Sequence, residues 1–132
     1  MTNVPIPLNA VKVGEISDKV KTALKLDMAV GTPIYIGQRN IEHMEREHPV
    51  EFERYFERLP QIIASPDYVG INQKDGSIEY IKNFPTYGGK FLKLAVRISK
   101  DNFLFARSLY EIFERTVRNR EKNGTLKPLT QI

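Results

Sequence analysis

The sequence predicts a single α+β domain in which helices come first and a run of antiparallel strands follows. Apolar residues recur at helical spacing through the first half, to about residue 64. After Ser65-Pro66-Asp67 they alternate with polar ones, and turn signals separate the segments. The length of 132 residues suits one domain with a hydrophobic core better than two. Because the strands are not interleaved with helices, α+β is favoured over α/β.

The first half is expected to contain an N-terminal arm and three helices. Residues 1–14 hold two prolines and a glycine, which favours an extended arm before one domain over 15–132. Pro49 separates the second and third helices because it lacks an amide hydrogen, and Pro60 predicts a kink or break late in the third. The predicted elements are a helix from Ser17, a short strand over 33–36, and helices over 38–47 and 50–64.

The second half is expected to form the sheet. Asp75-Gly76 is a hairpin turn signal, and residues 91–99 alternate clearly: Lys93 and Arg97 point away from the face that carries the leucines. The predicted elements are strands over 68–71, 77–84, 91–99 and 103–110, then a basic helix over 111–122 that stops at Asn123-Gly124.

Charge is distributed unevenly along the chain. The net charge is only +4, but residues 82–107 carry six basic residues and one acidic residue, a local balance of 6 − 1 = +5. Residues 39–58 carry four basic and six acidic residues, a balance of 4 − 6 = −2. This asymmetry indicates a polyanionic partner that meets the strands. The alternative is a solvated surface with uneven charge.

Several classes of protein are disfavoured. The chain has no cysteine, which removes disulfides and thiolate chemistry and fits a reducing compartment. The first residues lack the apolar core of a signal peptide, and no stretch is apolar enough to span a membrane, so we expect a cytoplasmic protein without a membrane partner. No glycine-rich phosphate loop and no nucleophile elbow are present.

Both histidines lie on the second predicted helix. His43 and His48 are five residues apart, which separates them by roughly 140° around a helix axis, so they are unsuited to chelating one metal. Imidazole exchanges protons near neutral pH, which suits a general acid or base. The structural alternatives are a partly buried imidazole at the helix end for His48 and an exposed surface residue for His43.

A second candidate cluster lies at the end of the last predicted strand, over residues 107–110. Alternation places Ser108 and Tyr110 on one face and Arg107 on the other, although a bulge would merge them. With Lys93 and Arg97 on the preceding strand, they offer hydroxyl groups and positive charge. RNA transesterification uses such groups, because it needs a base, an acid and cations around the phosphorane oxygens. The alternative is a solvated sheet face.

These residues occur in an order that resembles a nuclease family. The ordered pieces are Ile41-x-His43-Met44-x-x-x-His48, Ile62-x-x-Ser65-Pro66-Asp67-Tyr68-Val69, Ser77-Ile78-x-Tyr80-Ile81-Lys82, Leu94-x-Val96-x-Ile98 and Arg107-Ser108-Leu109-Tyr110. Together, from Val13 to Lys127, they resemble the phage-associated branch of the barnase–EndoU–colicin–RelE-like (BECR) nuclease superfamily. Ser108 stands where threonine is expected as often, which preserves the hydroxyl.

The resemblance implies N-terminal helices packed on a four-stranded antiparallel sheet, with a C-terminal helix. It also implies a metal-independent endoribonuclease without a cofactor, acting on RNA such as tRNA or mRNA as a phage or mobile-element toxin. An immunity or antitoxin protein is then a further expected partner. The residues that match the motifs of the family are His43, His48, Lys82, Arg107, Ser108 and Tyr110. We expect His43, His48, Arg107, Ser108 and Tyr110 to be catalytic. Lys82 is expected to bind the substrate together with Lys93 and Arg97, which strand alternation places on the polar face.

Two other classes of function stay open at this stage. One is a non-catalytic phage accessory protein that binds RNA or protein on the same scaffold, and the other is a small virion structural protein. The arginines and lysine of the C-terminal helix would extend an RNA-binding track or form a solvated basic face. The nuclease hypothesis requires the histidines and Ser108 to converge on the polar face of the sheet.

Overall fold

The computed structural model describes residues 9–129. The helices are α1 (Asp18–Leu24), α2 (Gln38–Glu47), α3 (Pro49–Tyr55), α4 (Leu59–Ala64) and α5 (Glu114–Lys122), with short 3-10 helices η1 (Phe56–Arg58) and η2 (Pro85–Tyr87). The strands are β1 (Ala10–Glu15), β2 (Pro33–Gly37), β3 (Tyr68–Ile71), β4 (Ile78–Phe84), β5 (Lys90–Ile98), β6 (Leu104–Ile112) and β7 (Leu126–Pro128). The α+β fold class is confirmed.

All the strands belong to one mixed sheet, with the order β1-β2-β6-β5-β4-β3-β7. The four strands predicted in the second half are present as an antiparallel meander, β3 to β6. The prediction of a four-stranded antiparallel sheet was nevertheless wrong. β2 joins β6 in parallel through only two residue pairs, β1 pairs with β2, and the three-residue β7 pairs with β3. β2 corresponds to the short strand expected over 33–36, but its place in the sheet depends on pairing between distant segments. β1 and β7 lie at the edges, where the apolar pattern is weak.

Several element boundaries differ from the prediction. Residues 10–14 of the expected arm belong to β1, while residues 1–8 lie outside the described part of the chain. The expected helix over 50–64 is split into α3, η1 and α4, and Pro60 lies in the first turn of α4. The last helix begins at Glu114 because β6 continues to Ile112.

The two faces of the meander have different neighbours. One face carries the main core, where Tyr80, Leu94 and Leu109 form a cross-strand row that is fully buried. Helical residues that include Val20, Met44, Leu59 and Ile62 complete this core. On the opposite face α5 covers only one end, where Val117 packs on Ile81. Beyond α5, that face carries Lys93, Arg97 and Ser108 together with Ala95 and Phe105.

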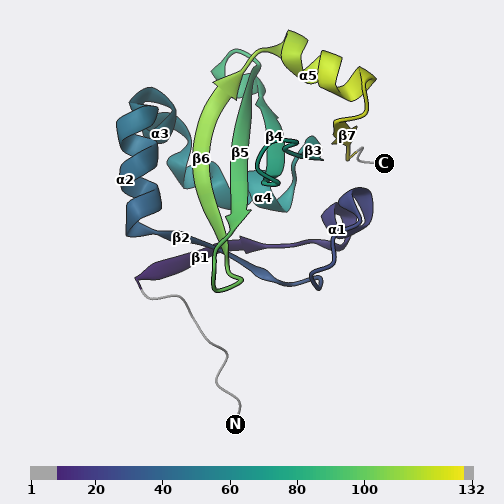
Figure 1. Cartoon of the computed structure of the whole chain (residues 1–132). Coiled ribbons are helices and arrows are strands. Elements are labelled where there is room, and N and C mark those ends of the chain that lie inside the picture. Colours follow the sequence, from purple (N-terminus) through teal and green to yellow (C-terminus); the bar gives the residue numbers. More distant parts are fainter. Residues whose placement is uncertain (1–8, 130–132) are drawn as a thin grey trace.

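Helices replace a strand along part of β6. β2 pairs with β6 only at Leu104 and Phe105, and beyond these residues α2 and α3 lie along β6 (Figure 1). The amide of Glu111 on β6 donates to Oε2 of Glu51 on α3 at 3.4 Å. The Glu51 carboxylate thus accepts a hydrogen bond from a backbone amide of β6, along a stretch where no strand pairs with β6. The junction between α2 and α3, which holds His48, is thereby placed beside β6.

Candidate functional site

A groove of about 840 Å³ opens where the start of α2 meets β5 and β6. Its wall on the helix side includes Arg39 and His43, and its wall on the sheet side includes Arg97, Phe105 and Arg107. Asn9, Gly37, Gln38, Asn40, Glu42, Ile98 and Ser99 complete the lining. The groove therefore brings together three of the residues singled out in the sequence: His43, Arg97 and Arg107.

The groove is positively charged. Arg39, Arg97 and Arg107 face one carboxylate in the lining, Glu42, which gives a balance of 3 − 1 = +2 without counting His43. Within residues 9–129 none of the three arginines forms an ion pair. Guanidinium groups without a carboxylate partner are suited to hydrogen bonding with the oxygens of an anion such as phosphate.

A bulge in β6 brings Arg107 to the groove. Ala95 pairs with Ser108 and Val96 pairs with Ala106, so Arg107 is the extra residue between them and has no partner on β5. A bulge changes the direction of the side chain that it carries. Arg107 is exposed and lines the same groove as Arg97. Alternation counted from Ser108 and Tyr110 would have put Arg107 on the opposite face.

His48 and Tyr110 form a second group farther along β6. Their rings are stacked, with centroids 5.1 Å apart and an interplanar angle of 26°. The Nδ1 atom of His48 lies 3.8 Å from Oε2 of Glu51, and Nζ of Lys93 lies 4.9 Å from the centre of the Tyr110 ring. The imidazole is thus held between an aromatic ring and a carboxylate, and its side chain is 38% exposed.

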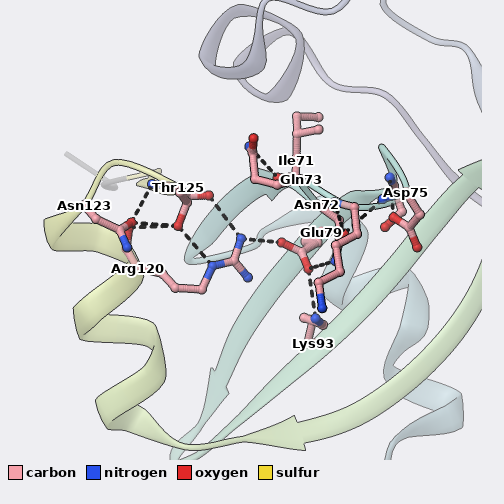
Figure 2. A network of polar contacts seen from close by, with 11 residues as sticks. Ile71, Asn72, Gln73, Asp75, Glu79, Lys93, Arg120, Asn123 and Thr125 are labelled. Atoms are coloured by element: carbon pink, nitrogen blue, oxygen red, sulfur yellow. Dashed lines mark hydrogen bonds and ion pairs between the residues drawn. The ribbon is translucent and has the colours of Figure 1, made fainter.

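Lys93 belongs to a buried ion network (Figure 2). Its ammonium donates to Oε2 of Glu79 at 2.8 Å, and Arg120 of α5 donates to Oε1 at 2.6 Å. Burial by itself would raise the pKa of Glu79, but the hydrogen bonds from Arg120 and Lys93 lower it below its usual value. Burial would likewise lower the pKa of Lys93, but Glu79 and Tyr110 raise it. Lys93 therefore stays charged at neutral pH.

Ser108 lies between the two groups. It pairs with Ala95, two residues from the pair of Lys93 and Tyr110. Since side chains two residues apart share a face, Ser108 and Tyr110 point to the same side of the sheet. Ala95 on β5 and Ser108 on β6 are both partly exposed. Their small side chains lie between the groove and the His48–Tyr110 stack.

Lys82 is not brought into this arrangement. Its ammonium donates to the carbonyl oxygen of Ser65 at 2.6 Å and to the Ser65 hydroxyl at 3.2 Å. Ser65 follows the last residue of α4, so this cation interacts with the carbonyl end of a helix. In the C-terminal helix Arg120 points inward to Glu79 and Arg118 pairs with Glu114 at 2.6 Å. Two of the basic residues of α5 are therefore paired with carboxylates.

Three contributors to the site were missed in the sequence: Arg39, Phe105 and Glu79. Arg39 sits in the first turn of a helix that follows a glycine, and this could have marked it as a cation near a helix N-terminus. Glu79 was detectable as the one acidic residue in the apolar stretch Ile78-Glu79-Tyr80-Ile81. No local signal identified Phe105, because aromatic residues are common in strands.

Two negative findings apply to the described residues. No group of three or more histidine, aspartate or glutamate side chains among residues 9–129 is arranged to hold a metal ion. In the same part of the chain no helix has the length and apolar character needed to cross a membrane.

The fold and the groove define an α+β protein whose partly open sheet face presents unpaired cations beside histidines. Comparison with family models then identifies the particular family. Residues 11–119 match the model described as phage-Barnase-EndoU-ColicinE5/D-RelE like nuclease3, and the chain belongs to this family of nucleases. The resemblance deduced from the sequence motifs is thereby confirmed. Comparisons with curated proteins and with solved structures found no match.

Proposed function

We propose that this nuclease is a metal-independent endoribonuclease that cleaves RNA through the ribose 2′-hydroxyl. The observation that supports the proposal best is the meeting of His43, Arg97 and Arg107 around one groove, with no carboxylate among residues 9–129 paired to either arginine. Guanidinium groups can neutralise the charge that develops on a phosphorane, and an imidazole can transfer the protons.

The proposed reaction needs one base and one acid. A base removes the proton of the 2′-hydroxyl, and the oxygen attacks the adjacent phosphorus. The bond between phosphorus and the 5′-oxygen then breaks while an acid protonates that oxygen. The products are a 2′,3′-cyclic phosphate and a free 5′-hydroxyl. We assign the proton transfers to His43 and His48, with Ser108 and Tyr110 as hydroxyl donors to the phosphate.

Lys93 has an electrostatic role in this proposal. The contacts with Glu79 and Tyr110 that raise its pKa keep it protonated, so it is unsuited to act as the base. Its charge is partly offset by Glu79, a fully buried carboxylate that it shares with Arg120. The cations that are available to a phosphate in the groove are therefore chiefly Arg39, Arg97 and Arg107. Lys82 lies elsewhere.

The test is cleavage of an end-labelled RNA in the presence of EDTA. The proposal predicts fragments with cyclic phosphate ends and a large loss of rate in the Arg97→Gln/Arg107→Gln variant. Arg115→Gln serves as the matched control, since Arg115 is an exposed cation on α5 outside the groove. Cleavage that requires an added metal ion, or that is unaffected by the double substitution, would contradict the proposal.

The histidines are tested separately. His43→Ala and His48→Ala should each reduce the rate, and the double variant should be inactive while still binding RNA. Cleavage that survives unchanged in the double variant would refute their assignment. A protein that binds several RNAs and cleaves none would instead support the non-catalytic binding module.

Membership of a phage-type nuclease family supports a proposal for the biological setting. We propose that this phage-type nuclease acts in the cytoplasm as a toxin or effector on tRNA or mRNA, restrained by an immunity or antitoxin protein. Growth arrest on induced expression, relieved by the Arg97→Gln/Arg107→Gln variant, would support this role. Unimpaired growth with active protein present would count against it.

A further inference from the structure

An aromatic ring lies within the cationic groove. Phe105 on β6 lines the groove and pairs across the strands with Arg97 on β5. A methyl group built at Gly37 would lie 3.7 Å from Cε1 of Phe105, so the edge of the ring reaches the start of α2. The side chain is only partly buried, although it is large and apolar.

The ring has an aromatic neighbour beside it on the adjacent strand. Tyr35 on β2 lies 6.3 Å from Phe105, between ring centroids, and is 7% exposed. Tyr35 also contacts Phe103 edge-on at 6.0 Å. Phe105 is therefore fixed by a packed partner, and a fixed ring can present an apolar surface to a ligand without losing further conformational freedom.

The neighbours of Phe105 match the two parts of a nucleotide. Arg97 and Arg107 are suited to the phosphate, and the face of an aromatic ring is suited to a base. We propose that Phe105 is a base-stacking platform and that the groove takes an unpaired nucleotide of single-stranded RNA. This inference rests on the proposed function, because it assumes that the polyanion is RNA.

The structure favours an unpaired base over a duplex. Bases inside a duplex are stacked on their neighbours, so their faces are not available to a protein side chain. A base that is free of a partner can lie on Phe105 while its phosphate contacts the arginines. Recognition of this kind tolerates sequence changes, since every base has an aromatic face. The platform is expected to select single strands more than particular bases.

Binding is measured with the intact protein and a 2′-O-methyl oligonucleotide, which lacks the nucleophile and cannot be cleaved. Phe105→Leu should weaken binding of the single strand by about fivefold or more, because base stacking is lost. Phe105→Tyr should restore it. Phe103→Leu is the matched control, since Phe103 contacts the same Tyr35 and does not line the groove. A 2-aminopurine base in the oligonucleotide should lose fluorescence on binding.

The outcomes separate this inference from the proposed function. Equal binding by Phe105→Leu and the unmodified protein, or equal affinity for single strand and duplex, would overturn the platform even if RNA is cleaved. Binding that depends on Phe105 would support the platform even if no RNA is cleaved. If Phe105→Leu does not fold, the Phe105→Tyr variant and the 2-aminopurine signal decide, and unchanged fluorescence on binding refutes stacking.

Discussion

Replacing Glu79 with glutamine would leave two cations next to an uncharged amide of nearly the same size. Glu79 is fully buried, and its two oxygens accept hydrogen bonds from Arg120 at 2.6 Å and from Lys93 at 2.8 Å. Asn72 adds a third hydrogen bond at 3.3 Å. The substitution removes the negative charge with little change in volume, so packing is largely preserved.

The size of the effect follows from the burial of the network. Removing one partner of a buried ion pair costs about 3–5 kcal/mol, because the remaining charge is left uncompensated. The side chains of Lys93 and Arg120 are 12% and 22% exposed, so both can regain some hydration. We therefore expect the free energy of unfolding to fall by about 3 kcal/mol, at the lower end of that range.

Urea unfolding at neutral pH, followed by circular dichroism, measures this change. Glu114→Gln is the matched control, because it breaks an ion pair with Arg118 in which the side chains are 56% and 66% exposed. The control should unfold almost like the unmodified protein, since exposed pairs are well solvated. A loss below about 1 kcal/mol in Glu79→Gln would refute the view that this network is important for stability.

The same network predicts a dependence on pH. The folded-state pKa of Glu79 lies below its usual value. Its contribution to stability is therefore present above the unfolded-state pKa of about 4.3 and is lost as the pH falls through the folded value. The difference in stability between the unmodified protein and Glu79→Gln should shrink below about pH 4.3. A constant difference down to pH 3 would contradict this reasoning.

Three further predictions concern charge, an unpaired hydroxyl and a close backbone contact. Arg97→Gln/Arg107→Gln should reduce the slope of log affinity against log salt for single-stranded RNA by about 1.4, as expected for two lost phosphate contacts; an unchanged slope would remove them from the interface. Tyr80→Phe should raise the free energy of unfolding by about 1 kcal/mol, because the buried Tyr80 hydroxyl has no partner among the described residues. Gly70→Ala should lower the free energy of unfolding by about 1–3 kcal/mol, since the new methyl group would lie 2.4 Å from the carbonyl oxygen of Thr125. Unfolding that matches the unmodified protein would show that β7 can shift to make room for the methyl group.

The meander could be predicted from the sequence because its period is strong and local. Leu92, Leu94 and Val96 are fully buried and alternate with Lys93, Ala95 and Arg97, which are partly exposed. β1 could not be predicted in this way, since its residues are at least partly exposed and its pairing with β2 is visible only in three dimensions. β7 is three residues long, which is too short to show any period.

The candidate site was predictable to a similar degree. Alternation predicts that Lys93 and Arg97 share a face. A bulge that brings Arg107 to the face of Ser108 is one of the two arrangements that the sequence allows, and the structure contains this bulge. No sequence pattern predicts the hydrogen bond from Lys82 to Ser65, because the two residues are 17 positions apart and lie on different elements. The catalytic roles of these residues stay predictions.

The motifs in the sequence alone therefore determined the nuclease family and the α+β class, since both depend on residue order and local periodicity. Only the tertiary structure decided which cations are available to a phosphate. Arg120 carries the same charge as Arg97, yet it is paired with Glu79, which lies 41 residues away. Availability depends on contacts between distant segments, and these form only when the strands and α5 pack together. The surface that can contact a phosphate therefore depends on which cations are ion-paired as much as on how many cations there are.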